Sequence, residues 1–461
     1  MGLNAAPTGP SERIASIDAV RGIALLGILV ANVRQMFLPW DVATFPVPGA
    51  QGELLGQLDW AFFDAVVDLK FITLFSLLFG MGFALQSGRS AVARPDFPAI
   101  YLRRIAMLAV FGALHALLLY PGDVLLPYAI AGLCLYATRG LSSRNLYRIG
   151  IVLVATTVVW GFQFGSLGRV SPGVTGIAMA AFAVVVALLW DRNWRAALVV
   201  VALVMAITIA VLLLRGDPRG WGQSVASEYS QALSDLAAMR SADAGSWPAE
   251  YAARRDGGFR ALLQLHAQQH GLVLVWFGVV LLWRTLGLNM IGAALVRSGA
   301  IAGATPRTWR RVSIVGLGIG LPMSVLATFL QSREMHGVSD WRWPEWLHVA
   351  SAFPLAIGFG ARVMLNEHLR KRRWWYAPME SAGRMALSNY VGQSLVLAAI
   401  AEPWGFGRYG RLSGPELTAL ACVVFAVLAL ASHAWLLRYR MGPLEWLWRC
   451  GTYWAWLPLR R

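Results

Sequence analysis

Long runs of apolar residues separated by short polar segments constrain this chain more than any other feature of its sequence. A stretch of about 17–25 apolar residues crosses ~30 Å of hydrocarbon as an α-helix. Of the 461 residues, 57% are hydrophobic and only 14% are charged. A soluble domain of this size needs a larger share of charged residues on its surface. The sequence therefore predicts an all-α, polytopic transmembrane helical bundle.

Segments of the required length occur along most of the chain, and we interpret twelve as spans. They are Ile17–Pro39, Trp60–Leu85, Tyr101–Tyr120, Val124–Thr138, Tyr147–Phe164, Gly173–Trp190, Trp194–Leu214, Gly271–Val296, Trp309–Leu330, Trp346–Met364, Glu380–Ala401 and Leu417–Leu437. The fourth is short, and only three residues separate the sixth from the seventh. An even number of spans predicts that both termini lie on the same side of the membrane.

The distribution of basic residues gives a second test of this topology. The formal net charge is +16, but the Lys and Arg residues occur in short clusters between apolar runs. With both termini in the cytoplasm, most of the 40 Lys and Arg residues fall on the cytoplasmic side, including the loops at 86–104, 297–308 and 365–379. The charge pattern thus predicts a membrane protein with both termini in the cytoplasm rather than a protein that binds nucleic acid.

The spans divide the chain into three parts. Residues 1–214 form an N-terminal transmembrane bundle, residues 215–270 form an extracytoplasmic helical loop, and residues 271–461 form a C-terminal transmembrane region. The tryptophan-rich segment that starts at Gly442 is typical of a helix lying in the inner interface. Membrane lipids are the expected partners, and a homodimer is left open.

Ionisable residues inside a membrane are costly, and they commonly mark a substrate or ion pathway. Most of them fall in the outer half of the predicted bundle, and we interpret six as candidate substrate-binding residues: Asn32, Arg34, Asp64, Asp68, Lys70 and Arg284. His115 and Asp123 flank a tight turn and are the candidate catalytic pair, because a carboxylate can orient a histidine for proton transfer. The alternative is that these polar side chains pair with one another and hold the helices together.

Other signals are weaker. His266 and His270 have the spacing of a two-histidine metal face but no identifiable carboxylate partner, so we predict no metal site. Asp18 and Arg21 are three residues apart at the start of the first span, where a local ion pair is expected. The sequence contains no phosphate-binding loop, nucleophile elbow or zinc-protease motif.

Several strings together resemble one family of membrane proteins. They are IDAVRGIALLGILVAN, KFITLFSLLFGMGFAL, RRIAMLAVFGALHALLLYPGDVLLPYAIAGL, GRMALSNYVGQS and GPLEWLWR. These strings occur in order between the first span and the C-terminal helix. They resemble the YeiB-like bacterial membrane proteins, which contain the domain of unknown function numbered 418, and the resemblance implies a location in the bacterial inner membrane. Some residues of these strings face the cytoplasm in the predicted topology, and we interpret them as an inner-face motif: Asp18, Arg21, Arg104, Arg384, Asn389, Glu445 and Arg449.

The first string is also similar to that of transmembrane acyltransferases such as heparan-alpha-glucosaminide N-acetyltransferase, through Asp18, Arg21, Gly22 and Asn32. The similarity implies transfer of an acyl group from cytoplasmic acyl-CoA to an acceptor across the membrane. Those enzymes use a histidine between the first two spans, but the corresponding stretch here, Leu38–Asp59, contains none. His115 is the candidate to replace it.

Two functions are therefore expected. The first is a membrane-embedded acyltransferase that acts on an extracytoplasmic or lipid acceptor, with acyl-CoA as donor. The second is a secondary transporter of a small anionic or amphipathic solute, in which Arg284 and the second-span aspartates bind substrate or protons. The absence of visible internal repeats and the resemblance both favour the enzyme.

Overall fold

The computed structural model describes residues 15–38, 54–88, 96–164, 253–254, 257–277, 281–334, 343–368 and 374–461. Throughout these residues the chain is helical, apart from turns and one isolated bridge between Tyr439 and Arg460. The prediction of an all-α fold is confirmed for the described residues. The elements are α1 (Ala15–Phe37), α3 (Leu54–Phe62), η3 (Phe63–Val67), α4 (Lys70–Gln86), α6 (Phe97–Leu118), α7 (Leu125–Ala137), α8 (Ser143–Phe164), α13 (Phe259–Trp276), α14 (Leu282–Arg297), α15 (Pro306–Glu334), α16 (Trp343–His368), α17 (Tyr376–Arg384), α18 (Ala386–Ala401), α19 (Gly414–Arg438) and α20 (Pro443–Tyr453).

Within the described residues, five helices are long and apolar enough to cross a membrane, judged by length and composition: Ser16–Phe37, Phe97–Leu118, Pro306–Ser332, Leu347–Asn366 and Gly414–Arg438. Each coincides with a predicted span. The spans predicted at Gly173–Trp190 and Trp194–Leu214, and most of the predicted loop at 215–270, lie outside the described residues. The end of that loop belongs to α13, which starts at Phe259 and continues to Trp276. The full set of twelve spans stays a prediction.

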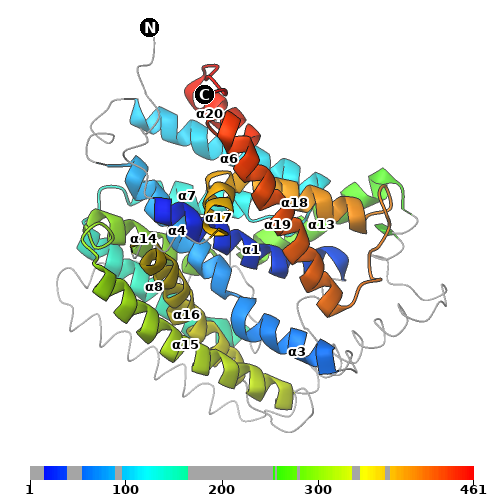
Figure 1. Cartoon of the computed structure of the whole chain (residues 1–461), viewed down its shortest axis with the longest axis horizontal. Coiled ribbons are helices and arrows are strands. Elements are labelled where there is room, and N and C mark those ends of the chain that lie inside the picture. The colour runs from blue at the N-terminus through cyan, green and yellow to red at the C-terminus, as the bar shows by residue number, and fades with distance from the viewer. Residues whose placement is uncertain are drawn as a thin grey trace.

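Helix α1 runs through the middle of the molecule, with α17, α18 and α19 on one side and α4 and α16 on another (Figure 1). Helices α15 and α16 pack along each other, and α14 packs against α4 and α8 (Figure 1). Glycines allow the α4–α14 contact to be close. A Cβ atom on Gly80 would lie 1.9 Å from the Asn289 carbonyl oxygen, and one on Gly292 would lie 2.1 Å from that of Leu77. Small residues at helix crossings are typical of membrane bundles.

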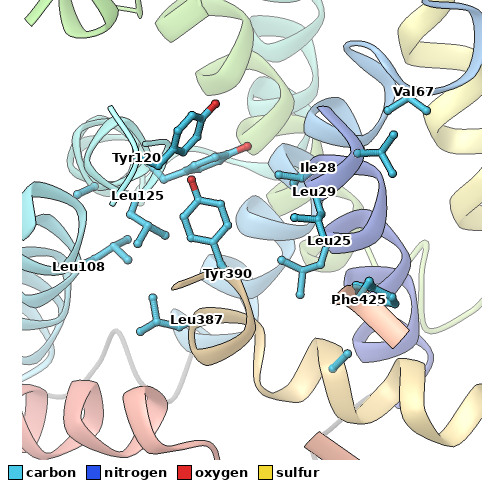
Figure 2. Close-up of a cluster of buried hydrophobic side chains, with 14 of the residues drawn as sticks. Leu25, Ile28, Leu29, Val67, Leu108, Tyr120, Leu125, Leu387, Tyr390 and Phe425 are labelled. Carbon is cyan, nitrogen blue, oxygen red and sulfur yellow. The ribbon is translucent and has the colours of Figure 1, made fainter. Parts of the chain in front are cut away.

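The largest apolar cluster forms around α1. Leu25, Ile28 and Leu29 of α1 extend toward Tyr120 and Tyr390 on one side, and Val67 lies on the other (Figure 2). The opposite pattern occurs on the outside of the bundle. Ile314 of α15 and Val423 and Val427 of α19 are more than half exposed, as expected for side chains that face lipid.

The second predicted span, Trp60–Leu85, is not one continuous helix. A π-helical turn, η3, follows α3, and the chain then breaks at Asp68 and Leu69 before α4 starts. Leu69 has a positive φ of 60°, which a leucine rarely adopts. The side chain of Lys70 forms a hydrogen bond across this break, because its Nζ donates to the Asp64 carbonyl oxygen at 2.6 Å. Irregular backbone of this kind within a membrane-protein bundle commonly marks a functional site.

The eleventh predicted span, Glu380–Ala401, is also divided, into α17 and α18 at Met385. Side chains satisfy the backbone groups released by this break. The Asn389 amide donates to the carbonyls of Ala382 and Met385, at 3.1 and 3.0 Å. The Glu445 carboxylate accepts from the amides of Leu387 and Ser388, at 2.7 and 3.1 Å. These contacts provide the capping that a helix terminus requires.

Candidate functional site

The predicted catalytic pair forms a direct contact. His115 lies near the end of α6, the chain reverses at Pro121 and Gly122, and Asp123 precedes α7. The His115 Nδ1 atom is 2.8 Å from Asp123 Oδ1, and the two side chains are almost completely buried. The second carboxylate oxygen accepts the Leu126 amide at 2.8 Å, so Asp123 also caps the first turn of α7. Sequence reasoning placed both residues beside one turn but did not establish contact between them.

The contact fixes the chemistry of the imidazole ring. A carboxylate oxygen can only accept, so the proton lies on Nδ1, and Nε2 of the neutral ring carries a lone pair. Nε2 is buried and has no hydrogen-bond partner among the described residues. The ring lies 4.8 Å from that of Tyr390, whose hydroxyl accepts the Val124 amide. A histidine oriented by a carboxylate with a free Nε2 is the arrangement of a general base.

Two histidines contact the same turn, and a glutamate lies beside one of them. The Nδ1 atoms of His266 and His270 on α13 contact the carbonyl oxygens of Leu117 and Pro121, at 3.0 and 2.8 Å. Glu402, at the end of α18, lies with Oε1 3.8 Å from His266 Nε2 and forms a buried ion pair with Arg254. His266 and His270 therefore use one ring nitrogen each to hold the backbone between His115 and Asp123.

A second polar cluster lies at the break between η3 and α4. His348 of α16 contacts both second-span aspartates: its Nε2 is 2.9 Å from Asp68 and its Nδ1 is 3.4 Å from Asp64. Lys70 Nζ is 3.3 Å from each nitrogen of that ring. Thr328 of α15 donates to Asp64 at 2.5 Å, and the Gln331 amide lies within donating distance of the same carboxylate. The cluster can exchange protons among its histidine and carboxylates.

Ligand atoms of Asp64, Asp68 and His348 lie within 4.8 Å of one another, close enough for one metal ion. However, the fully buried Lys70 ammonium already supplies a positive charge at this position. A metal ion would have to displace that ammonium, because two cations in contact repel each other strongly where water is excluded. The residues therefore fit a compensated charge cluster better than a metal site.

The predicted substrate-binding residues do not form a single group. Arg34 pairs with Asp59 at 2.8 Å and also donates to Thr418, so its guanidinium joins α1 to α3 and α19. Asn32 faces the hydroxyl of Tyr120 at 3.5 Å, beside the catalytic pair. Arg284 is buried and donates to the Thr73 hydroxyl of α4. The sequence placed most of these residues in the outer half of the predicted bundle, whereas the structure has two polar clusters, one at the turn between α6 and α7 and one at the break between η3 and α4.

The inner-face residues have mainly structural contacts. Asp18 and Arg21 form the expected ion pair, at 2.8 Å. Arg104 stacks on the Trp448 ring of α20, with its guanidinium carbon 3.9 Å from the ring centroid. Glu445 and Asn389 cap the break between α17 and α18. Arg384 and Arg449 lie on α17 and α20 near this break.

His348 is the member of the second polar cluster that sequence reasoning missed. It is buried on α16 and separated from Asp68 by 280 positions. Its predicted span, Trp346–Met364, was identified from hydrophobicity alone, and a histidine near the end of a span is compatible with an interfacial position. One signal could have identified it: in the predicted topology, His348 lies near the outer end of its span, on the same side of the membrane as Asp64 and Asp68.

Comparisons with known proteins give a family but no activity. Residues 295–455 match the family described as protein of unknown function, DUF418. The chain is 30% identical over 452 residues to the uncharacterised protein YeiB of Escherichia coli K12, covering 95% of this chain and 96% of that protein. It is 27% identical to the uncharacterised protein YxaH of Bacillus subtilis 168, covering 99% and 98% of the two chains. No solved structure matches. The chain therefore belongs to the family of bacterial proteins that includes YeiB.

Proposed function

We propose that this protein is a membrane-embedded acyltransferase that moves an acyl group from acyl-CoA to an extracytoplasmic or lipid acceptor. The observation that supports it is the buried His115 ring, which is oriented by Asp123 through Nδ1 and has a free Nε2. Such a ring can remove a proton from a hydroxyl or amine as that group attacks a thioester. The similarity of the first span to transmembrane acyltransferases favours the same reaction.

In the proposed reaction, the acceptor donates its hydroxyl or amine proton to His115 Nε2. The acceptor oxygen or nitrogen forms a bond with the thioester carbonyl carbon, and the bond from that carbon to the CoA sulfur breaks. The thiolate then takes the proton from Nε2, so the ring returns to its starting state. Asp123 stabilises the imidazolium that exists between these two transfers.

The proposal includes the finer topology. Twelve spans with both termini in the cytoplasm place the α6–α7 turn on the outer side of a bacterial inner membrane. Acyl-CoA enters among the inner-face arginines, and the acceptor arrives from the outer side or from the lipid. The pantetheine arm of acyl-CoA then has to extend along the bundle from the inner-face motif, so that the thioester carbon reaches His115.

The experiment uses inverted membrane vesicles from cells that overproduce the protein, with acyl-labelled acetyl-CoA added to the exposed cytoplasmic face. An acyltransferase converts the label into an ester or amide of an acceptor and releases one free CoA thiol for each acyl group transferred. Vesicles with His433→Gln are a matched control, because this histidine contacts Ser381 on α17 and lies in neither polar cluster. Equal thiol release with and without the protein would contradict the proposal.

A secondary transporter is the second candidate, and a specific observation supports it. The helix break at Leu69 and the adjacent Asp64, Asp68 and His348 resemble the discontinuous helices at which transporters bind ions and substrates. Transport moves a solute without chemical change, so solute uptake that depends on His348 and occurs without thiol release would favour this function.

A further inference from the structure

We propose that the acceptor binds at an outer histidine cluster, formed by His115, His266, His270 and Glu402, and that it is recognised as a donor of several hydrogen bonds, through hydroxyl or ammonium groups. The proposal rests on the acyltransferase function and specifies the chemical class of its acceptor. The argument depends on which nitrogen of each ring carries the proton.

The protonation of the three rings follows from their partners. His266 Nδ1 and His270 Nδ1 contact backbone carbonyl oxygens, and His115 Nδ1 contacts a carboxylate. All of these oxygens can only accept, so each Nδ1 atom must carry a hydrogen. In the neutral ring the Nε2 atom then carries a lone pair and no hydrogen, so it can only accept a hydrogen bond. The three histidines therefore present the same type of free atom.

The free atoms are buried. His115, His266, His270 and Glu402 have relative exposures of 2%, 0%, 6% and 2%. The Nε2 atom of each ring and Oε2 of Glu402 have no hydrogen-bond partner within the described part of the chain. Buried acceptors without a donor are unfavourable, and native proteins satisfy nearly all of them with protein, water or ligand. Four such atoms close to one turn are therefore available to a ligand that supplies donors.

The four side chains are linked through contacts around one short segment. The segment runs from His115 to Asp123, which contact each other. His266 and His270 contact two of its carbonyl oxygens, at Leu117 and Pro121. Glu402 joins through His266, at 3.8 Å. Helix α13 thus packs on the segment that carries His115, and the end of α18 joins it through the contact between Glu402 and His266.

This set of acceptors selects among ligand classes. An anionic group would face three lone pairs and the carboxylates of Asp123 and Glu402, and the nearby Arg254 guanidinium is already paired with Glu402. Phosphates and carboxylates are therefore disfavoured. A single metal ion is also disfavoured, because the described residues contain only one group of three close metal ligands, and it lies at Asp64, Asp68 and His348. Hydroxyl and ammonium groups both donate hydrogen bonds and also carry the proton that His115 must remove.

Nitrogen NMR of the protein labelled at its seven histidines tests this directly. The protein is placed in phosphatidylcholine nanodiscs, whose headgroups contain no hydrogen-bond donor. Three probes with the same alkyl chain are added in turn: octyl glucoside supplies hydroxyls, octylamine supplies an ammonium, and octylphosphocholine supplies no donor. Signals are assigned with His115→Gln, His266→Gln and His270→Gln, and His433→Gln is the control for a ring outside the cluster.

We expect the Nε2 signals of the three cluster histidines to be unprotonated and to shift in a saturable way with octyl glucoside, with octylamine or with both. Octylphosphocholine should leave them unchanged, and His266→Gln should weaken the response of the other two rings. Protonated Nε2 atoms, or no shift with either donor probe, would overturn the proposal. The measurement uses no acyl-CoA, so a protein that responds to the probes but releases no thiol would contradict the enzyme and not the ligand class.

Discussion

His115 Nδ1 lies 2.8 Å from Asp123 Oδ1 across a chain reversal, and the other oxygen of that carboxylate caps α7 through the Leu126 amide. One side chain therefore orients a proton-transfer group and fixes the helix that follows it. Gly112 makes this arrangement possible, because a Cβ atom there would lie 2.4 Å from the Leu126 nitrogen. The structural and catalytic interpretations of Asp123 can be separated only by a variant that keeps its shape.

Asp123→Asn is that variant. The amide has the size of the carboxylate and can still accept from Leu126, but its nitrogen donates to His115 Nδ1 and moves the ring proton to Nε2. We expect folded yield close to that of the unchanged protein and a loss of acyl transfer of about 10²–10⁴-fold, the usual size of a general-base contribution. Yield by size-exclusion chromatography and thiol release in vesicles measure the two effects. Unchanged transfer would show that the carboxylate has only a capping role.

The Arg34–Asp59 pair predicts a large effect on stability. Both side chains are buried, at 6% and 7% exposure, and are 2.8 Å apart. Removing one partner leaves an uncompensated charge, so Asp59→Leu should cost about 3–5 kcal/mol of unfolding free energy. Combining it with Arg34→Met should recover most of that loss, because the remaining charge is also removed. Unfolding in detergent micelles measures both. A double variant as unstable as Asp59→Leu would contradict the pairing.

Glu445 predicts a pH dependence. Burial raises the pKa of its carboxyl above the ordinary value, and this effect exceeds the opposing effect of its hydrogen bonds with Ser388 and Leu387. The folded protein therefore holds this proton more tightly than the unfolded chain, and stability from this group is lost as pH rises through the raised pKa. The stability of Glu445→Gln relative to the unchanged protein should increase from acid to neutral pH. Thermal unfolding across this range measures it, and a pH-independent difference would contradict the shift.

Topology is tested by labelling single cysteines in a protein whose native Cys134, Cys422 and Cys450 are replaced by serine. Arg307→Cys lies at the start of α15, and Arg411→Cys lies in the turn before α19. We expect an impermeant thiol reagent to label the first only from the cytoplasmic side and the second only from the outer side. The positive-inside pattern is the physical reason. Labelling of both positions from the same side would contradict the twelve-span arrangement.

The sequence predicted the helices more fully than the sites. Ile17–Pro39 closely matches α1, because a long apolar run with polar ends leaves few alternatives. The Asp18–Arg21 pair was also predictable, since its partners are three residues apart on one helix. Local spacing carries this information, and it is available from the chain alone.

The helix breaks and the cross-chain contacts were not predictable in the same way. Hydrophobicity averages over Leu69 and Met385, so neither break alters the apolar pattern. The sequence placed Asp64 and Asp68 on one helix but could not place His348 beside them, because tertiary packing brings that residue from 280 positions away. Likewise, His266 and His270 suggested a metal face by spacing, whereas their Nδ1 atoms contact backbone carbonyls of another helix and turn.

The most direct measurement is the rate of thiol release with His115→Gln, made together with the folded yield of the same preparation. Glutamine keeps a polar side chain of similar length but cannot take up a proton. The account predicts normal or near-normal yield, with transfer reduced by about 10²–10⁴-fold, and no change for His433→Gln. A well-folded His115→Gln protein that transfers acyl groups at the original rate would contradict the assignment of His115 as the general base.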